Sequence, residues 1–158
     1  MFHAFILTAY TISTSADCSY SCLKCSRTIA MRLINTATGE LRDFFDTQKP
    51  KYSILSHTWG SDEISYLDFL LLTSNASSTS AGLVQTLLRS PRKDSQGFRK
   101  VEAACKFAQS RGFEWIWIDS VCIDKSSSAE LSEAINSMWR WYSDAVECFV
   151  YLFDVSPI

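Results

Sequence analysis

The feature that most constrains the fold is an alternation of short apolar runs with helical periodicity along the second half of the chain. The runs at 52–57, 114–119 and 148–153 have the length and composition of buried strands. Between them, 98–111 and 127–145 carry apolar residues at spacings of three and four, as amphipathic helices do. Parallel strands need such crossover connections. We therefore expect an α/β domain of three layers, a parallel sheet with helices on both faces.

Local signals support this assignment. Ser127 and Glu130 have the spacing of a capping box, which begins a helix by satisfying free backbone N–H groups. Upstream, 32–34 and 41–45 predict a hairpin whose turn contains Gly39, because glycine tolerates the positive φ that such turns require.

Composition limits the class of protein. With 158 residues, 47% of them hydrophobic, the chain can bury the core of one domain and is not a disordered chain. A net charge of −2 gives no basic excess for contacts with phosphate backbones. We expect no nucleic-acid partner.

The chain divides near residue 30. Residues 1–30 predict a disordered or weakly packed extension, whereas 31–158 carry the domain signals. The apolar stretch 2–12 lacks a basic n-region and is too short to span a bilayer, so no membrane partner is expected; a cleaved signal peptide is the alternative. Within the domain, the polar stretch 73–97 predicts a flexible insertion.

The six cysteines favour a reducing compartment, and we expect a cytoplasmic protein. Cys105, Cys122 and Cys148 fall singly in apolar runs, which is typical of packed thiols and not of a disulfide framework. Cys18, Cys22 and Cys25 form a C-x3-C-x2-C cluster, but a closed zinc site needs four ligands and the chain has only two histidines. No metal site is expected.

Polar segments follow the first two predicted parallel strands. They are 56–60 (SHTWG) and 119–125 (DSVCIDK). Sites in open parallel sheets form at the carboxyl ends of strands, so His57 and Asp119 should line one shallow polar pocket near Trp59 and Asp124. The alternative is a structural role, in which His57 forms a hydrogen bond with a neighbouring loop, and Asp119 and Asp124 accept hydrogen bonds from backbone N–H groups of the connecting turn.

Two hydrolytic interpretations are weaker. Ser56 and His57 are adjacent on one strand and point to opposite faces, which prevents the hydrogen bond of a Ser-His-Asp triad. Cys122 has the residue type of a thiolate nucleophile, but a buried cysteine after a strand is more often a small packed hydrophobe. The aromatic residues Trp115, Trp117 and Trp139 favour core packing over a stacking surface.

Three segments resemble one family. YSILSHTWG at 52–60, WIWIDSVCIDKSSSAELSEAINSMWRWY at 115–142 and the CFVYLFDV that follows are similar to the heterokaryon-incompatibility (HET) domain of filamentous fungi, and MRLINTATGEL from Met31 resembles the usual start of such proteins. The family triggers programmed cell death when genetically different fungal cells fuse. It is distantly similar to TIR domains, which implies a flavodoxin-like fold.

The resemblance also implies site residues, partners and a substrate. The motif positions that we take as a candidate polar pocket are Ser56, His57, Trp59, Gly60, Asp119, Cys122, Asp124 and Glu130. The partners implied are further copies of the chain or other death-pathway proteins. Some TIR domains cleave NAD, so NAD is the possible substrate, and no cofactor is implied.

One departure from the family pattern bears on activity. Family members continue into a segment of the form RGWTLQEL, whose glutamate is the likeliest catalytic residue by analogy with NAD-cleaving TIR domains. The chain stops at Ile158 without it. We expect an incomplete sheet, an assembly or effector module, self-association and no NAD turnover, with no residue assigned as catalytic; NAD cleavage is the alternative, and a thiol- or metal-dependent hydrolase the least favoured.

Overall fold

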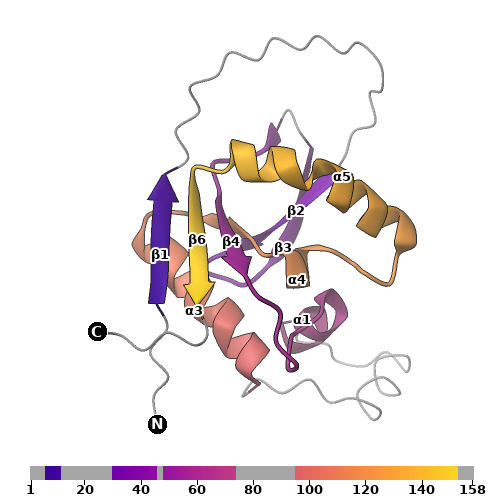
Figure 1. Ribbon diagram of the computed structural model, residues 1–158, viewed down its shortest axis with the longest axis horizontal. Helices are drawn as coiled ribbons and strands as arrows, with labels where there is room; N and C mark the ends of the chain where they lie inside the picture. The colour runs from indigo at the N-terminus through magenta and orange to yellow at the C-terminus, as the bar shows by residue number, and fades with distance from the viewer. Residues whose placement is uncertain (1–5, 12–29, 46–47, 74–94, 153–158) are drawn as a thin grey trace.

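The computed structural model describes residues 6–11, 30–45, 48–73 and 95–152, which form one open sheet flanked by helices (Figure 1). The elements are β1 (Ile6–Thr11), β2 (Ala30–Asn35), β3 (Leu41–Phe45), β4 (Ser53–His57), α1 (Tyr66–Thr73), α3 (Gln96–Ser110), β5 (Trp115–Trp117), α4 (Asp119–Cys122), α5 (Ser128–Asp144) and β6 (Glu147–Leu152). Among these described residues, no helix is both long and apolar enough to cross a membrane.

The strands form a mixed sheet of six in the order β1-β6-β4-β5-β2-β3. At its centre β4 pairs in parallel with β5 and with β6, so the predicted α/β architecture with three parallel strands is confirmed. The outer pairs, β1 with β6, β2 with β5 and β2 with β3, are antiparallel. The sheet is therefore not parallel throughout, because the predicted hairpin β2–β3 extends it at one side and β1 at the other.

Helices cover both faces of the sheet, as expected. The chain passes from β4 to β5 in one direction and then back across β4 to β6. Right-handed crossovers that move in opposite directions place their helices on opposite faces. On one face Phe107 of α3 meets Phe149 at 5.0 Å between ring centroids, and on the other Trp141 of α5 meets Trp117 at 5.5 Å.

The core fills the space between these layers. Ile54, Ile116 and Phe149, from the three parallel strands, are fully buried. Trp117 is buried beside them, as expected, but Trp139 is 83% exposed. The expectation of core packing is wrong for Trp139, because α5 buries the face that carries Ala134, Ser137 and Trp141 and Trp139 lies outside it.

The hairpin is tied to the rest of the domain by Arg32 of β2. Its guanidinium contacts Asp43 on β3 at 3.1 Å and Glu130 on α5 at 2.8 Å. It also donates to the carbonyl of Cys122 at 3.2 Å and lies 4.3 Å from the centre of the Tyr66 ring. One side chain thus joins four elements, and burial of its charge is compensated by two carboxylates.

Two segments differ from their expected boundaries. Ile6–Thr11, assigned to a disordered or weakly packed extension, forms β1 along β6. Pairing there satisfies backbone groups that β6 would otherwise leave open at its edge. Within the predicted insertion 73–97, Thr73 ends α1 and 96–97 begin α3, while 74–94 lie outside the described residues, as does the cluster at 18–25.

Candidate functional site

The site begins where β4 and β5 end. The connections that follow these two neighbouring strands turn to opposite faces of the sheet, and such a switch point leaves a crevice at the carboxyl ends of the strands. His57 is the last residue of β4, and Asp119 begins α4 two residues after β5. Nε2 of His57 lies 2.7 Å from Oδ1 of Asp119. The sheet topology thus brings together residues that are 62 positions apart.

Lys100 of α3 completes this contact from the other side of the ring. Its Nζ lies 2.7 Å from Nδ1 of His57 and 2.5 Å from Oε2 of Glu63. An ammonium group has only donors, so Nδ1 must accept and Nε2 carries the proton that is donated to Asp119. The chain Glu63–Lys100–His57–Asp119 is therefore a continuous run of hydrogen bonds with a neutral imidazole in a fixed tautomer.

Asp119 is held by further donors at the surface. Its Oδ2 accepts from Nε1 of Trp59 at 2.9 Å, and Nζ of Lys125 lies 4.0 Å away. Burial alone would raise the pKa of Asp119, but the hydrogen bond from His57, the charge of Lys125 and the hydrogen bond from Trp59 together lower that pKa. Asp119 is consequently a carboxylate near neutral pH.

Lys125 also packs on Trp59. Its Nζ lies 3.2 Å from the centre of the indole ring, a cation–π contact. Burial lowers the pKa of Lys125, and Lys100 adds to this, whereas Asp119 and Glu63 oppose it. Trp59 is thereby fixed by a hydrogen bond at its edge and a charge on its face, although about half of its surface is exposed.

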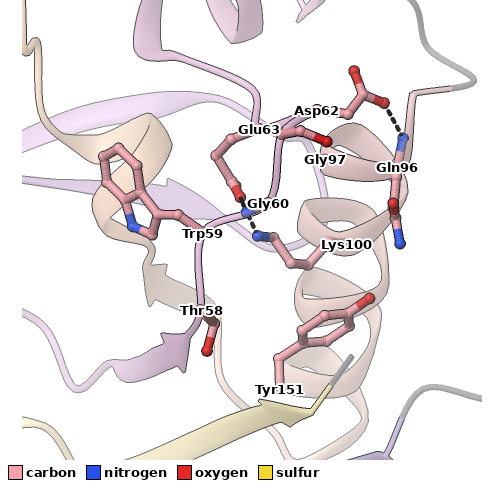
Figure 2. Close-up of a pocket in the computed structure, with 10 residues that line it drawn as sticks. Thr58, Trp59, Gly60, Asp62, Glu63, Gln96, Gly97, Lys100 and Tyr151 are labelled. Carbon is pink, nitrogen blue, oxygen red and sulfur yellow. Dashed lines mark hydrogen bonds and ion pairs between the residues drawn. The ribbon is translucent and has the colours of Figure 1, made fainter. Parts of the chain in front are cut away.

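A pocket of about 160 Å³ opens beside this cluster. Figure 2 shows the loop after β4, the start of α3 and Tyr151 of β6 around it. Its lining residues are Thr58, Trp59, Gly60, Ser61, Asp62, Glu63, Gln96, Gly97, Lys100 and Tyr151. Aromatic rings and both signs of charge therefore border one small cavity.

The loop after β4 is fixed against α3 at close range. The N–H of Gly97 donates to the carbonyl of Asp62 at 3.1 Å, and the N–H of Gln96 donates to Oδ2 of Asp62 at 2.9 Å. A Cβ on Gly97 would lie 2.4 Å from Asp62 O and 2.7 Å from Ile64 N, so only glycine fits. This contact holds Glu63 in reach of Lys100.

The predicted site residues separate into two groups. His57, Trp59 and Asp119 are brought into contact, and Gly60 follows them in the loop, where its N–H donates to Oε2 of Glu63 at 3.3 Å. Ser56 points to the opposite face of the sheet and hydrogen-bonds Tyr142 of α5. This alternation is the one that argued against a Ser-His-Asp triad.

Cys122 does not belong to the cluster. Its thiol is fully buried, accepts a hydrogen bond from the N–H of Ile118 at 3.4 Å, and has a pKa raised by burial. A thiol whose pKa is raised in this way is a poor nucleophile. The structure corrects its inclusion in the pocket and favours the packed-hydrophobe interpretation.

Asp124 and Glu130 also lie elsewhere. Asp124 accepts from the N–H and hydroxyl of Ser126 through Oδ1, at 3.0 and 2.6 Å, and so shapes a turn. Glu130 donates its N–H to Oγ of Ser127, which is half of the predicted capping box, but its carboxylate accepts from the N–H of Asp124 at 2.7 Å and pairs with Arg32. Both are structural residues, which corrects their assignment to the pocket.

Sequence reasoning missed Glu63, Lys100 and Tyr151. A signal existed for Lys100, since it stands beside Val101 and three residues after Gly97 on the buried stripe of α3, where a charged residue needs a partner. No pattern in the sequence distinguished Glu63 or Tyr151 from ordinary loop and strand residues.

This geometry suits binding better than proton transfer. Both nitrogens of His57 are engaged, and its side chain is only 1% exposed, so it is not placed to take a proton from a ligand. In the parts of the chain that the structure describes, no three histidine, cysteine or acidic side chains gather as metal ligands do. The cluster instead fixes Trp59, which lines the pocket, and Lys125 packs on the Trp59 ring.

Comparison with known proteins identifies the family. The family model for the heterokaryon incompatibility protein (HET) matches residues 52–156. The vegetative incompatibility protein HET-E-1 of Podospora anserina is 42% identical over 133 residues, which are 80% of this chain and 8% of that relative. No solved structure matches, so a flavodoxin-like or TIR-like fold stays a prediction. With the matched segment spanning both strand-end motifs and most of the domain, the chain belongs to the heterokaryon incompatibility (HET) protein family.

Proposed function

We propose that this chain acts in fungal heterokaryon incompatibility, as an effector module whose engagement leads to programmed cell death. The observation that carries the proposal is the family match over 52–156, which includes His57 and Asp119. The 42% identity to a vegetative incompatibility protein supports it, although the chain spans only 8% of that relative. The role in incompatibility that the relative's name states is therefore extended to this chain only as a proposal.

The module works by binding and assembly, through contacts with further copies or with other death-pathway proteins. The hydrogen bonds at both ring nitrogens of His57 support this role. An imidazole with neither nitrogen open to a ligand can position its neighbours but cannot exchange a proton with a substrate. We place the module in the cytoplasm. The free thiols of Cys105, Cys122 and Cys148 among the described residues support a reducing compartment.

Inducible expression in a filamentous fungus tests the role. The wild-type chain should reduce viability on induction, and the double variant His57→Ala/Asp119→Ala should abolish the effect at equal abundance. Glu102→Gln on the exposed face of α3 is the matched control and should kill like the wild type. An abundant wild-type chain that leaves growth unchanged would overturn the proposal.

An assay with NAD tests the binding role against catalysis. The purified chain incubated with NAD should release no nicotinamide. Carboxylates are the side chains suited to stabilise an oxocarbenium-like transition state. Asp119 and Glu130 are both engaged by protein donors. Nicotinamide release that Asp119→Asn abolishes would show that the module is an enzyme.

A further inference from the structure

The pocket beside the His57 cluster contains a buried hydrogen-bond acceptor that the fold leaves unused. The Glu63 side chain is 12% exposed, and its Oε2 accepts from Nζ of Lys100 at 2.5 Å and from the N–H of Gly60 at 3.3 Å. Its Oε1 is buried as well, but has no hydrogen-bond partner in the parts of the chain that the structure describes. A carboxylate oxygen buried without a donor is unfavourable, so a molecule in the pocket that donates to Oε1 gains binding energy there.

Lys100 offers the complementary group next to Glu63. Its side chain is 5% exposed, and its Nζ donates to Nδ1 of His57 and to Oε2 of Glu63. An ammonium group has three N–H donors, so within the described residues these two bonds leave one N–H of Lys100 without an acceptor. The pocket thus presents one donor and one acceptor, Nζ and Oε1, on two neighbouring residues of its lining.

The size and walls of the pocket suit a single planar ring. Tyr151 of β6, which is 5% exposed, forms one wall, and its ring centre lies 5.7 Å from Nζ of Lys100. Figure 2 shows the Tyr151 ring and Glu63 on opposite sides of that ammonium group. The volume of about 160 Å³ is close to that of a cavity of roughly 150 Å³ that holds benzene. One six-membered ring is therefore the size that fits.

The charges around the pocket disfavour an ionic ligand. The Lys100 ammonium repels a cation placed at Oε1, and the carboxylates of Glu63 and Asp62 repel an anion. The backbone N–H groups of Gln96 and Gly97 at the start of α3 do not offer an anion site, since both donate to Asp62. A neutral molecule is the better match.

We propose that this pocket binds a neutral, planar molecule of one-ring size that carries an amide edge, with an N–H beside a carbonyl. The N–H donates to Oε1 of Glu63, the carbonyl accepts from Nζ of Lys100, and the ring lies against Tyr151. Two kinds of molecule offer this edge, a pyrimidinedione such as uracil and a ring carboxamide such as benzamide. The proposal goes beyond the incompatibility function and does not depend on it.

NMR titration of the ¹⁵N-labelled full chain with uracil and with benzamide measures this binding. At least one of the two should shift the backbone amide signals of 58–63 and 96–100, with a dissociation constant on the order of millimolar for so small a molecule. The tighter of the two identifies the source of the amide edge. If neither shifts these signals at about 10 mM, the proposal is overturned.

Two sets of analogues test the chemistry on the unaltered chain. The compounds 1,3-dimethyluracil and N,N-dimethylbenzamide keep the ring and the carbonyl but have no N–H, whereas benzoate and benzamidine keep one ring but carry a negative and a positive charge. Each should bind at least about tenfold more weakly than the tighter amide, because each leaves Oε1 without a donor or places a charge beside one of the same sign. An analogue that binds as tightly as that amide would overturn the proposal.

Glu63→Gln tests the residue that accepts. With its amide oxygen beside Lys100, the glutamine turns its NH₂ group to the position of Oε1, where a donor then meets a donor. Binding should weaken at least about tenfold in a chain whose other NMR signals are unchanged. Glu102→Gln, on the exposed face of α3, is the matched control and should bind like the wild type. A folded Glu63→Gln that binds as the wild type does would overturn the proposal; if this variant does not fold, the analogues decide the question on the wild type.

Discussion

His57 and Asp119, at the carboxyl ends of two neighbouring parallel strands, share a hydrogen bond of 2.7 Å whose direction is fixed by Lys100 on the far side of the imidazole. The proton lies on Nε2, and the charge on Asp119 is matched by donors on both of its oxygens. Measurements of stability test this hydrogen bond and the packing of the loop beside it. Measurements of thiol reactivity test the burial of the cysteines.

The first prediction concerns the pH dependence of stability. The pKa of Asp119 in the folded chain is lowered from its usual value of 3.8, so its ionisation stabilises the folded chain above about pH 4, and this contribution is lost as the pH falls through the folded pKa. Asp119→Asn should lower the free energy of unfolding at pH 7 by roughly 1–3 kcal/mol. The difference from the wild type should shrink below pH 4, as measured by urea titrations at several pH values.

The control for this experiment is Glu102→Gln, an exposed carboxylate of α3 that should change stability by less than about 0.5 kcal/mol. A deficit for Asp119→Asn that is as large at pH 3 as at pH 7 would mean that its charge is not what stabilises the site.

The second prediction concerns the buried pair Lys100 and Glu63. Lys100→Met leaves a buried carboxylate without its cation and should cost about 3–5 kcal/mol in the free energy of unfolding. Adding Glu63→Gln removes that uncompensated charge, so the double variant should be more stable than Lys100→Met alone. Chemical denaturation of the two single variants and the double variant gives the coupling energy.

Lys106→Met, on the exposed side of the same helix, serves as the control and should be nearly neutral. Strictly additive effects at Lys100 and Glu63 would contradict the contact between them.

The third prediction concerns the close approach of the loop to α3. Gly97→Ala places a methyl group against backbone atoms at 2.4 and 2.7 Å, so the loop must move, at a cost of about 1–3 kcal/mol. Gly60→Ala meets no atom within 4 Å and should be tolerated. Thermal unfolding of the two variants measures the effect of the same substitution at two positions that line one pocket. Equal melting temperatures would show that the close approach of Gly97 to the loop does not matter for stability.

The fourth prediction concerns the cysteines. Burial raises the pKa of Cys105 to about 12 and also raises that of Cys122, so neither thiol should react with iodoacetamide at pH 8 while the chain is folded. Peptide mapping by mass spectrometry should find both alkylated only after unfolding in urea. Rapid alkylation of Cys122 in the folded chain would restore the nucleophile interpretation.

Periodicity along the chain predicted the elements because each strand and helix buries one face. Strands β4, β5 and β6 and helices α3 and α5 lie within a few residues of their predicted bounds. The pairing of β2 with β5 was not predicted, because a hydrophobic pattern shows that a strand is buried without naming its neighbour. The pairing of β1 with β6 escaped prediction for a different reason, since Ile6–Thr11 was assigned to a disordered or weakly packed extension and not to a strand.

The contact between His57 and Asp119 could be predicted because the topology determines it, but neither residue lines the pocket beside them, as had been expected. His57 and Asp119 each follow a strand, and sheet order brings strand ends together. Glu130 and Cys122 carry residue types suited to chemistry, but local contacts with Arg32 and Ile118 give them structural roles that sequence spacing cannot reveal. Lys100 reaches the site from a helix, and its partner His57 is 43 positions away in the sequence.

The anchoring of the hairpin by Arg32 has a consequence for where such a domain can be joined to another protein. The segment that the family model matches begins at residue 52, yet Met31, Leu33 and Ile34 of β2 are fully buried and Arg32 is paired with Glu130 inside the matched segment. The unit that gene fusion must carry intact therefore extends at least twenty-two residues upstream of its recognisable signature, from residue 52 back to residue 30. A fusion joined at the signature boundary would transfer the motif and leave part of the core behind.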